Sequence, residues 1–247
     1  MMPRVVAVEA LDGLPQDHPD AIRSRCDLRR VHRAMGSRLI ILRALKAMTT
    51  ARLVARPLRV LEIGAGAGSL LLRVAQAIAP VWPKVELTLL DHQALIDHAA
   101  IEGYADVGWT VVVEVGDVLD WAASDPDTLL MDNATVHWDL IIANLFLHHF
   151  EGEQLATLLQ AIAKKADRFL ACEPRRDWLA LAGSHLTGVL GANAVTRQDA
   201  VLSVHAGFRG NELSELWPEP GDRWQIQEHS AGPFSHCFCT ERLEAIR

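Results

Sequence analysis

The sequence predicts an α/β fold, doubly wound, with a mostly parallel seven-stranded sheet, a terminal antiparallel hairpin and an N-terminal helical lid. Short apolar runs typical of buried strands alternate with segments of helical periodicity from residue 58 onward. The first of these runs leads into a glycine-rich turn at 64–68. The last two runs follow each other with no helix between them, which predicts a hairpin.

The first half of the chain is expected to supply the lid and three strands. A helical pattern over 29–48 predicts one amphipathic helix that could cover a bound cofactor, and its apolar positions are Val31, Met35, Leu39, Leu42 and Leu45. Pro57 precedes the first strand, and Pro80 ends the first helix of the sheet region. We expect strands over 58–63, 85–90 and 110–115, and helices over about 69–79 and 93–102.

The second half supplies the other four strands. We expect a fourth strand over 138–144, a helix over 151–165, a fifth strand over 168–173, and final strands over 223–228 and 235–240. Because strands and helices alternate up to the fifth strand, the connections should be right-handed crossovers in a parallel sheet. Residues 1–50 are expected to form the lid and 51–247 the α/β domain. Within that domain, 176–222 is expected to be a substrate-binding insertion.

Composition limits the classes of protein that the chain can belong to. Half of its 247 residues are hydrophobic, which is enough for one large core. No secretory signal and no apolar run of membrane-spanning length is visible, so we expect a soluble, cytoplasmic protein without membrane contact. Cys26 and Cys172 stand alone, and Cys237 and Cys239 should share one face of a strand. These cysteines indicate neither a disulfide framework nor a zinc site.

Charge is unevenly distributed along the chain. The net charge is −7, yet residues 23–59 hold eleven Lys or Arg residues against one acid, Asp27. Such a basic segment could bind an anionic substrate, an acidic carrier protein or a nucleic-acid backbone. The simpler interpretation of the charges is a helix face exposed to solvent. Because the rest of the chain is acidic and no nucleic-acid signature is visible, we do not expect a nucleic-acid partner.

The glycine turn indicates the cofactor. Glycine permits sharp turns and close backbone approach, and a helix N-terminus offers free N–H groups. A dinucleotide fingerprint has the spacing Gly-x-Gly-x-x-Gly. Here the order is Glu62-Ile63-Gly64-Ala65-Gly66-Ala67-Gly68-Ser69. This Glu-x-Gly-x-Gly-x-Gly pattern resembles the S-adenosylmethionine loop of class I methyltransferases, and the terminal hairpin is similar to theirs as well.

The resemblance also implies which residues would contact S-adenosylmethionine. Asp91 ends the second strand, where a carboxylate can accept both ribose hydroxyl hydrogens of either adenosine-bearing cofactor. By resemblance, Asp117 would lie near the adenine amino group with Val118 against the ring, and Asn144 would line the methionine portion. Asp117 and Asn144 could instead form turns. The predicted cofactor-binding residues are Glu62, Gly64, Ala65, Gly66, Gly68, Asp91, His92, Asp117, Val118 and Asn144.

A second motif indicates the substrate class. The segment Asn144-Leu145-Phe146-Leu147-His148-His149-Phe150 is similar to the Leu-His-His motif of methyltransferases acting on quinone precursors and other small molecules. The Asn/Asp-Pro-Pro-aromatic signature of nucleic-acid amino-methyltransferases is absent. Methyl transfer requires alignment and, for some acceptors, removal of a proton. We expect His148 or His149 to be the catalytic histidine. The two cannot both face the site, and either could merely cap the following helix.

Substrate-binding and metal-binding residues are harder to assign. Within the insertion, His185, Asn193, Arg197 and His205 are the candidate substrate-binding residues, with an ordinary loop role as the alternative for each. The pair Asp132-Asn133 could suggest a metal-dependent mechanism. It precedes the fourth strand instead of following a strand end, so a turn is the better interpretation and we predict no metal.

The resemblance implies a methyltransferase that moves the methyl group of S-adenosylmethionine to a small, largely apolar acceptor, such as an aromatic or polyketide-like hydroxyl. One alternative is a noncatalytic protein that binds the same cofactor, because a fold does not guarantee turnover. Another is an NAD-dependent oxidoreductase, which Glu62, Ser69 and the hairpin disfavour. The sequence leaves open whether the chain forms a homodimer or contacts a carrier protein.

Overall fold

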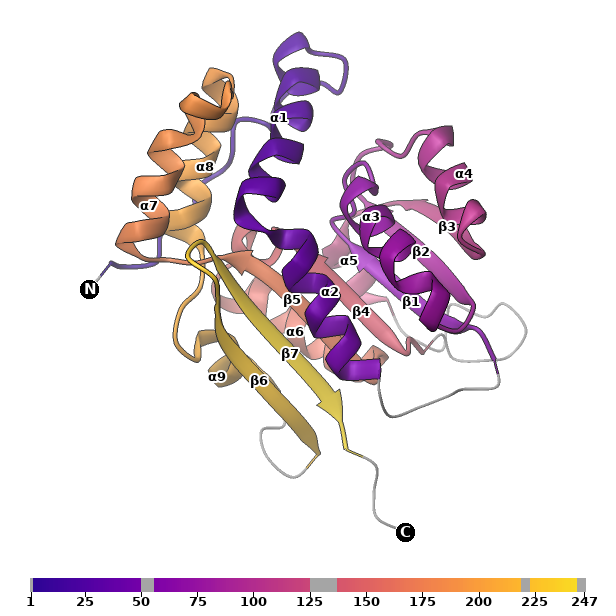
Figure 1. Ribbon diagram of the computed structural model, residues 1–247. Helices are drawn as coiled ribbons and strands as arrows, with labels where there is room; N and C mark the ends of the chain where they lie inside the picture. Colours follow the sequence, from indigo (N-terminus) through magenta and orange to yellow (C-terminus); the bar gives the residue numbers. More distant parts are fainter. Residues whose placement is uncertain (1, 50–55, 125–136, 219–222, 244–247) are drawn as a thin grey trace.

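Seven strands form one sheet in the computed structural model, which describes residues 2–49, 56–124, 137–218 and 223–243 (Figure 1). The strand order is β3-β2-β1-β4-β5-β7-β6. The strands are β1 (Leu58–Ile63), β2 (Val85–Asp91), β3 (Trp109–Val115), β4 (Leu140–Asn144), β5 (Arg168–Pro174), β6 (Trp224–Ala231) and β7 (Ser235–Arg242). Strands β1 to β5 are parallel, and β7 pairs antiparallel with both β5 and β6. The predicted doubly wound sheet and terminal hairpin are confirmed.

The strand order reverses between β1 and β4, which are adjacent in the sheet but are separated in the chain by β2 and β3. At such a switch point the connecting loops diverge, and a crevice opens beyond the carboxyl ends of the strands. The side chains of β4 and β5 are almost all buried, as expected for parallel strands that helices cover on both faces.

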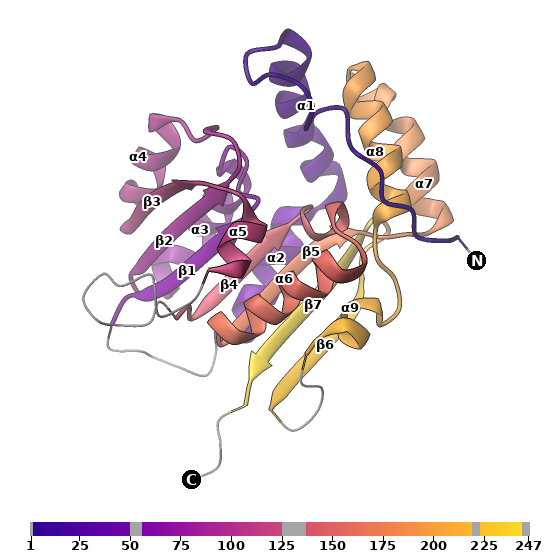
Figure 2. The same cartoon turned by 180° about the vertical axis from the view of Figure 1, so that it is seen from behind.

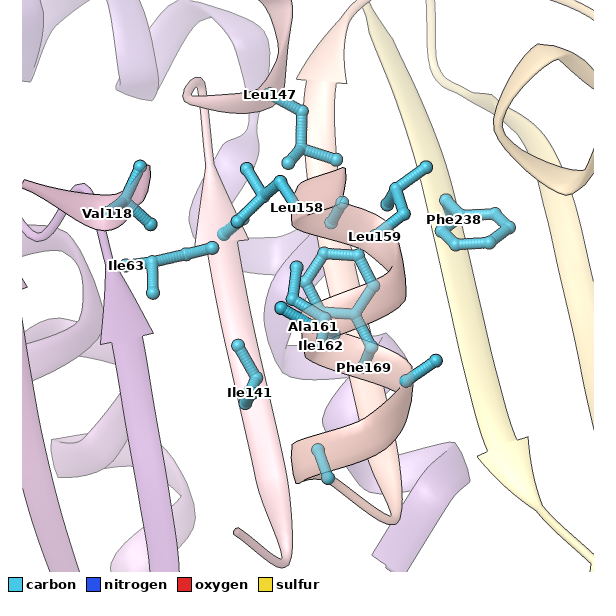
Figure 3. Close-up of a cluster of buried hydrophobic side chains, with 14 of the residues drawn as sticks. Ile63, Val118, Ile141, Leu147, Leu158, Leu159, Ala161, Ile162, Phe169 and Phe238 are labelled. Atoms are coloured by element: carbon cyan, nitrogen blue, oxygen red, sulfur yellow. The ribbon is translucent and has the colours of Figure 1, made fainter. Parts of the chain in front are cut away.

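Helices cover both faces of the sheet (Figures 1 and 2). One face carries α2 (Ser37–Thr49), α3 (Ser69–Ile78) and α4 (His98–Asp106), and the other carries α5 (Val118–Ala123), α6 (Gly152–Lys165) and α9 (Glu212–Leu216). Alternate residues of a strand point to opposite faces. Val60 therefore packs with the α2 and α3 side chains, while Leu61 and Ile63 join the cluster around α6 (Figure 3).

A third group of helices stands beyond the carboxyl ends of the strands (Figure 1). It consists of α1 (Pro19–Met35), α7 (Trp178–His185) and α8 (Ala194–Ala206), with a short 3-10 segment at Leu186–Leu190. The Asn193 backbone N–H donates to Asp27 Oδ2 at 2.8 Å, and Ser24 Oγ lies 3.0 Å from Asn193 Oδ1. The helix α1 and residues 178–206 are therefore joined into one unit, which we call the roof. The predicted boundary at residues 50 and 51 lies outside the described residues.

Two predicted helices differ from those observed. The expected helix over 29–48 is two helices, because Gly36 takes a left-handed conformation at φ 71° and caps α1. The chain changes direction there, so Leu39 is 49% exposed while Ile41 and Leu45 are buried. The helix expected over 93–102 begins only at His98, where Asp97 accepts the Ala100 N–H. Among the described helices, none combines the length and apolarity needed to cross a bilayer.

Candidate functional site

The glycine turn between β1 and α3 forms the floor of the site. Gly64, Gly66 and Gly68 all have left-handed φ values, between 55° and 66°. At Gly64, an added Cβ would lie 2.1 Å from a ring carbon of Phe146, so only glycine fits there. The N-terminus of α3 has no side-chain cap, which leaves its first N–H groups for a ligand or water.

Asp91, the last residue of β2, stabilises this turn by accepting backbone hydrogen bonds. Its Oδ2 accepts the Gly66 N–H at 2.8 Å, and its Oδ1 accepts the Gln93 N–H at 2.9 Å. His92 Nδ1 is 3.4 Å from Oδ1. Because each carboxylate oxygen has a second lone pair, Asp91 can still accept hydroxyl hydrogens from a ligand.

Glu62 is a buried acid without a hydrogen-bond partner at one of its oxygens. Its side chain lines the cleft beside Gly64, yet the residue is only 4% exposed. Burial, with a smaller contribution from the charge of Asp91, raises the pKa of Glu62 to about 8. The Oε2 atom accepts no hydrogen bond from the described residues. A cationic donor from a ligand would satisfy it.

The turn after β4 brings Asn144, His148 and His149 to the site. Asn144 ends the strand, and its buried Oδ1 has no hydrogen-bond partner among the described residues. Leu145 follows at φ 51°, a strained value for a side chain of this size. A short 3-10 helix, Leu147–His149, comes next.

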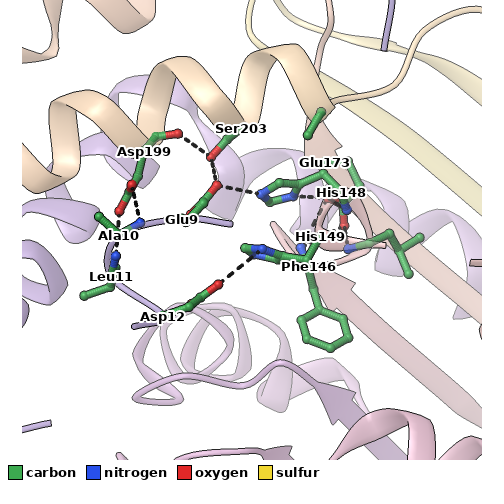
Figure 4. Close-up of polar contacts among 12 residues, drawn as sticks. Glu9, Ala10, Leu11, Asp12, Phe146, His148, His149, Glu173, Asp199 and Ser203 are labelled. Atoms are coloured by element: carbon green, nitrogen blue, oxygen red, sulfur yellow. Dashed lines mark hydrogen bonds and ion pairs between the residues drawn. The ribbon is translucent and has the colours of Figure 1, made fainter. Parts of the chain in front are cut away.

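Glu173, at the end of β5, fixes this turn. The residue is fully buried, and its carboxylate accepts the Phe146 and Leu147 N–H groups at 2.9–3.2 Å. The His148 ring donates to Glu173 Oε2 from Nδ1 at 2.8 Å (Figure 4). A single carboxylate thus satisfies the free donors of the turn and orients one imidazole.

His148 lies between two carboxylates. Its Nε2 is 3.4 Å from Glu9 Oε1, on the side opposite Glu173. Burial opposes the charged imidazole, but Glu173 and Glu9 outweigh it and raise the pKa of His148 to about 9. Held in this way, His148 is oriented by its neighbours and is poorly suited to accept a proton at neutral pH.

His149 has a different environment. Its side chain is 24% exposed, and Nδ1 lies 3.5 Å from Asp12 Oδ2. Burial and the neighbouring charge of His148 lower the pKa of His149. The two rings are close, with centroids 4.3 Å apart. Both histidines line the cleft, and His149 is the more exposed of the two to solvent.

Residues 2–14, which we call the N-terminal strap, carry Glu9 and Asp12 across the site (Figure 4). Asp199 of α8 accepts the Ala10 and Leu11 N–H groups at 2.8 and 3.0 Å. Ser203, one turn further along α8, donates to Glu9. The strap is therefore hydrogen-bonded to α8 close to Glu9 and Asp12, whose carboxylates lie beside the two histidines.

Two connected hollows meet at the strap. The first, which we call the cofactor cleft because most of the predicted cofactor residues line it, has a volume of about 340 Å³ and includes the glycine turn, Asp91 and Asn144. The apolar cavity has a volume of about 360 Å³ and lies among α1, α7 and α8. The residues that line both hollows are Glu9, Leu11, Leu28, Leu145 and Ser203.

Most predicted cofactor residues line the cleft. These are Glu62, Gly64, Ala65, Gly66, Asp91, His92 and Asn144, together with the histidines His148 and His149. Gly68 supports the turn from behind, where Tyr104 donates to its carbonyl. Asp117 and Val118 do not line the cleft. Asp117 caps α5 by accepting the Leu119 N–H at 2.7 Å, and Val118 is buried in the core beside α6.

The four candidate substrate residues lie outside both hollows. Asn193 caps α8 and joins it to α1, and the His205 carbonyl accepts a strap N–H from Val5. Arg197 and His185 line a separate shallow hollow on the outer surface of the roof. None of the four therefore lines the apolar cavity or the cofactor cleft.

Sequence reasoning missed Glu9, Asp12 and Glu173. Glu173 could have been found, because it ends a parallel strand at the same edge of the sheet as Asp91 and Asn144. The strap residues carry no motif and no periodicity, so their position depends on tertiary contacts alone. The Asp132-Asn133 pair lies outside the described residues.

No family model matches the chain, and no curated protein matches it. Solved structures, in contrast, match over most of its length. The plantazolicin methyltransferase BpumL, in complex with S-adenosylhomocysteine (SAH), has a TM-score of 0.62 at 13% identity, with 91% of each chain covered. An O-methyltransferase family protein from Burkholderia thailandensis has a TM-score of 0.56 at 16% identity, covering 91% of this chain and 60% of that one.

A third match is the magnesium protoporphyrin IX methyltransferase ChlM from Synechocystis PCC 6803 with bound SAH. Its TM-score is 0.51 at 14% identity, and 94% of this chain and 91% of that one are covered. At such identities the likeness establishes the fold. The chain has the Rossmann-like fold of class I methyltransferases, as the resemblance of the glycine turn implied.

Proposed function

We propose that the protein is a methyltransferase that uses S-adenosylmethionine to methylate a small, largely apolar acceptor, with an aromatic or polyketide-like hydroxyl as the acceptor group. The observation that carries this proposal is the cofactor cleft, where a glycine turn, the acid at the end of β2 and two buried oxygen atoms without hydrogen-bond partners converge. The matched structures support it, since they are methyltransferases solved with SAH or S-adenosylmethionine.

The cleft residues fit the polar groups of this cofactor. Glu62 and Asn144 each leave a buried oxygen unpartnered, which suits an ammonium group. Asp91 can accept two ribose hydroxyl hydrogens, and Arg25 or Arg29 of α1 could pair with a carboxylate. When bound, the cofactor supplies an activated methyl group on a sulfonium.

The apolar cavity is the proposed acceptor site. Its lining is mainly aliphatic, with side chains such as Leu28, Val31 and Met35 from α1. Glu9 and Ser203 supply polar atoms where the cavity meets the cofactor cleft. A mainly apolar molecule with one polar group would bury its body among the aliphatic residues and turn that group toward the cleft.

The two histidines have separate roles in this proposal. His149 faces the cleft and is proposed to contact the acceptor. His148 is proposed to act as a positioning residue, because Glu173 and Glu9 hold it from both sides. The chain's contribution to catalysis is then mainly alignment of the acceptor with the methyl group and exclusion of water.

Calorimetric titration with S-adenosylmethionine, SAH and NAD tests the cofactor assignment. We expect both sulfur cofactors to bind and NAD not to bind. Preference for NAD would favour an oxidoreductase, and absence of binding by all three would overturn the proposal. If the sulfur cofactors bind, incubation with phenolic and polyketide-like acceptors should yield methylated product and SAH. Binding without turnover across such a set would favour a noncatalytic role.

A further inference from the structure

Glu9, His148 and His149 form a cluster of potential metal ligands at the junction of the two hollows. Each offers one ligand atom, and these atoms lie within 4.8 Å of one another. The carboxylate comes from the N-terminal strap and the two imidazoles come from the turn after β4 (Figure 4). Three protein ligands are the usual number in an open catalytic metal site, where a further position is left for water or substrate.

The His148 nitrogen that faces this cluster has an ion-pair contact with Glu9 but no hydrogen bond. His148 is 2% exposed, and its Nε2 makes no hydrogen bond with the described residues. The separation from Glu9 Oε1 is 3.4 Å, which exceeds an ordinary N–H···O hydrogen bond. It is close to the ligand-to-ligand distance of about 3.4 Å in a tetrahedral site with metal–ligand bonds of about 2.1 Å.

The other side of the His148 ring is arranged as in a metal site. Metal-binding histidines commonly donate their second ring N–H to a carboxylate, which fixes the ring and the tautomer. Here Glu173 accepts from His148 Nδ1 at 2.8 Å and is itself anchored by backbone N–H groups of the same turn. This contact leaves Nε2 as the nitrogen available to a cation, which would displace the proton that the charged imidazole carries there.

We propose that Glu9, His148 and His149 bind a divalent transition-metal cation such as Zn²⁺, Mn²⁺ or Co²⁺. Two imidazoles and one carboxylate suit these ions better than Mg²⁺, which prefers oxygen ligands. The ion would take the position between Nε2 and Glu9. The prediction of no metal rested on Asp132-Asn133, which is a different part of the chain.

The role of the ion rests on the proposed function, whereas the site itself does not. A cation at this junction would lie where the polar group of the acceptor is proposed to enter. An acceptor hydroxyl bound to the cation would lose its proton to bulk water and keep the electron pair on oxygen. The oxygen would then be a stronger nucleophile for the methyl group, without a side chain that must remove the proton.

Metal binding to the full chain tests the site without any measurement of turnover. Protein treated with a chelator is titrated with Zn²⁺, Mn²⁺, Co²⁺ and Mg²⁺ in turn, followed by calorimetry, thermal unfolding and, for Co²⁺, visible absorption. We expect binding of a single transition-metal ion per chain and a raised melting temperature. Glu9→Gln and His149→Gln should each weaken binding by at least tenfold.

Two controls separate the possible results. His98→Gln removes a histidine that is exposed and remote from the cluster, and it should bind the ions as the unsubstituted protein does. Unchanged affinity in both Glu9→Gln and His149→Gln would overturn the proposal, as would the absence of binding by all three transition metals. SAH titration of the metal-free protein is scored separately, so loss of the cofactor assignment and loss of the metal site are distinguishable.

Discussion

The carboxylate of Glu173 and the imidazole of His148 are paired at 2.8 Å, and both side chains are buried. The pair joins the end of β5 to the turn after β4, and the same carboxylate accepts three backbone N–H groups there, from Phe146, Leu147 and His148. The position of both histidines, and hence the junction of the two hollows, therefore depends on Glu173.

Replacing Glu173 by Gln should destabilise the protein. The amide keeps one acceptor oxygen but turns an NH₂ group toward backbone N–H donors and leaves His148 without its partner. Removing one member of a buried charge pair costs about 3–5 kcal/mol in free energy of unfolding. Urea unfolding measures the change. Glu102→Gln, at an exposed position on α4, serves as the control and should change stability by less than about 0.5 kcal/mol. A similar small change for Glu173→Gln would contradict the anchoring role.

Asp91→Ala should weaken SAH binding by at least about tenfold, since a lost charge-assisted hydrogen bond is worth about 1.5–3 kcal/mol. The substitution also frees the Gly66 N–H, so the glycine turn loses a contact that orders it. Calorimetric titration with SAH gives the affinity. Unchanged affinity would show that the ribose assignment is wrong.

Asp117→Ala separates two interpretations of this residue. Because Asp117 caps α5, its loss should lower the free energy of unfolding by about 1 kcal/mol. It does not line the cleft, so SAH affinity should stay within about twofold of that of the unsubstituted protein. A tenfold loss of affinity without a loss of stability would support the adenine contact that the sequence resemblance implied.

Glu62 should make the stability of the ligand-free protein depend on pH. Its pKa is raised from an ordinary 4.5 to about 8, so the folded protein binds more protons than the unfolded chain between these values. The free energy of unfolding should therefore fall as pH rises through this window. Glu62→Gln removes this decline. The melting temperature of the variant minus that of the unsubstituted protein should therefore be more positive at pH 9 than at pH 5. An equal difference at both pH values would show that Glu62 ionises normally. The same substitution should weaken SAH binding, because a neutral amide pairs poorly with an ammonium group.

The fold and the cofactor cleft could be predicted from sequence because they depend on local patterns. The strands are recognisable as short apolar runs in the sequence. Glu62, Asp91 and Asn144 lie at or near the ends of such runs, and the carboxyl ends of parallel strands meet at one edge of the sheet. The break at Gly36 could not be told from helical periodicity, which continues across it. Glu9 reaches the site only because Asp199 and Ser203 bind the strap, and contacts between segments almost 200 residues apart leave no local signal. The candidate substrate residues lie outside both hollows for a related reason: polar side chains such as that of Asn193 form hydrogen bonds between helices.

Narrowing the apolar cavity should affect the acceptor without affecting the cofactor. Ala200 lines the cavity from α8 and does not line the cofactor cleft. A phenylalanine at this position would fill part of the space of about 360 Å³ in which the acceptor is proposed to bind. For an acceptor found by the screen, KM should rise at least about tenfold, since loss of a well-packed apolar contact costs about 1–3 kcal/mol.

The control for this change is Ala182→Phe, which adds the same bulk on the exposed side of α7, away from both hollows. It should leave KM unchanged, and both variants should bind SAH as the unsubstituted protein does. If Ala200→Phe weakened SAH binding instead, the two hollows would not be separate sites. If KM did not change for the larger acceptors, the acceptor would have to bind elsewhere, since the added ring and a bulky molecule cannot share the cavity.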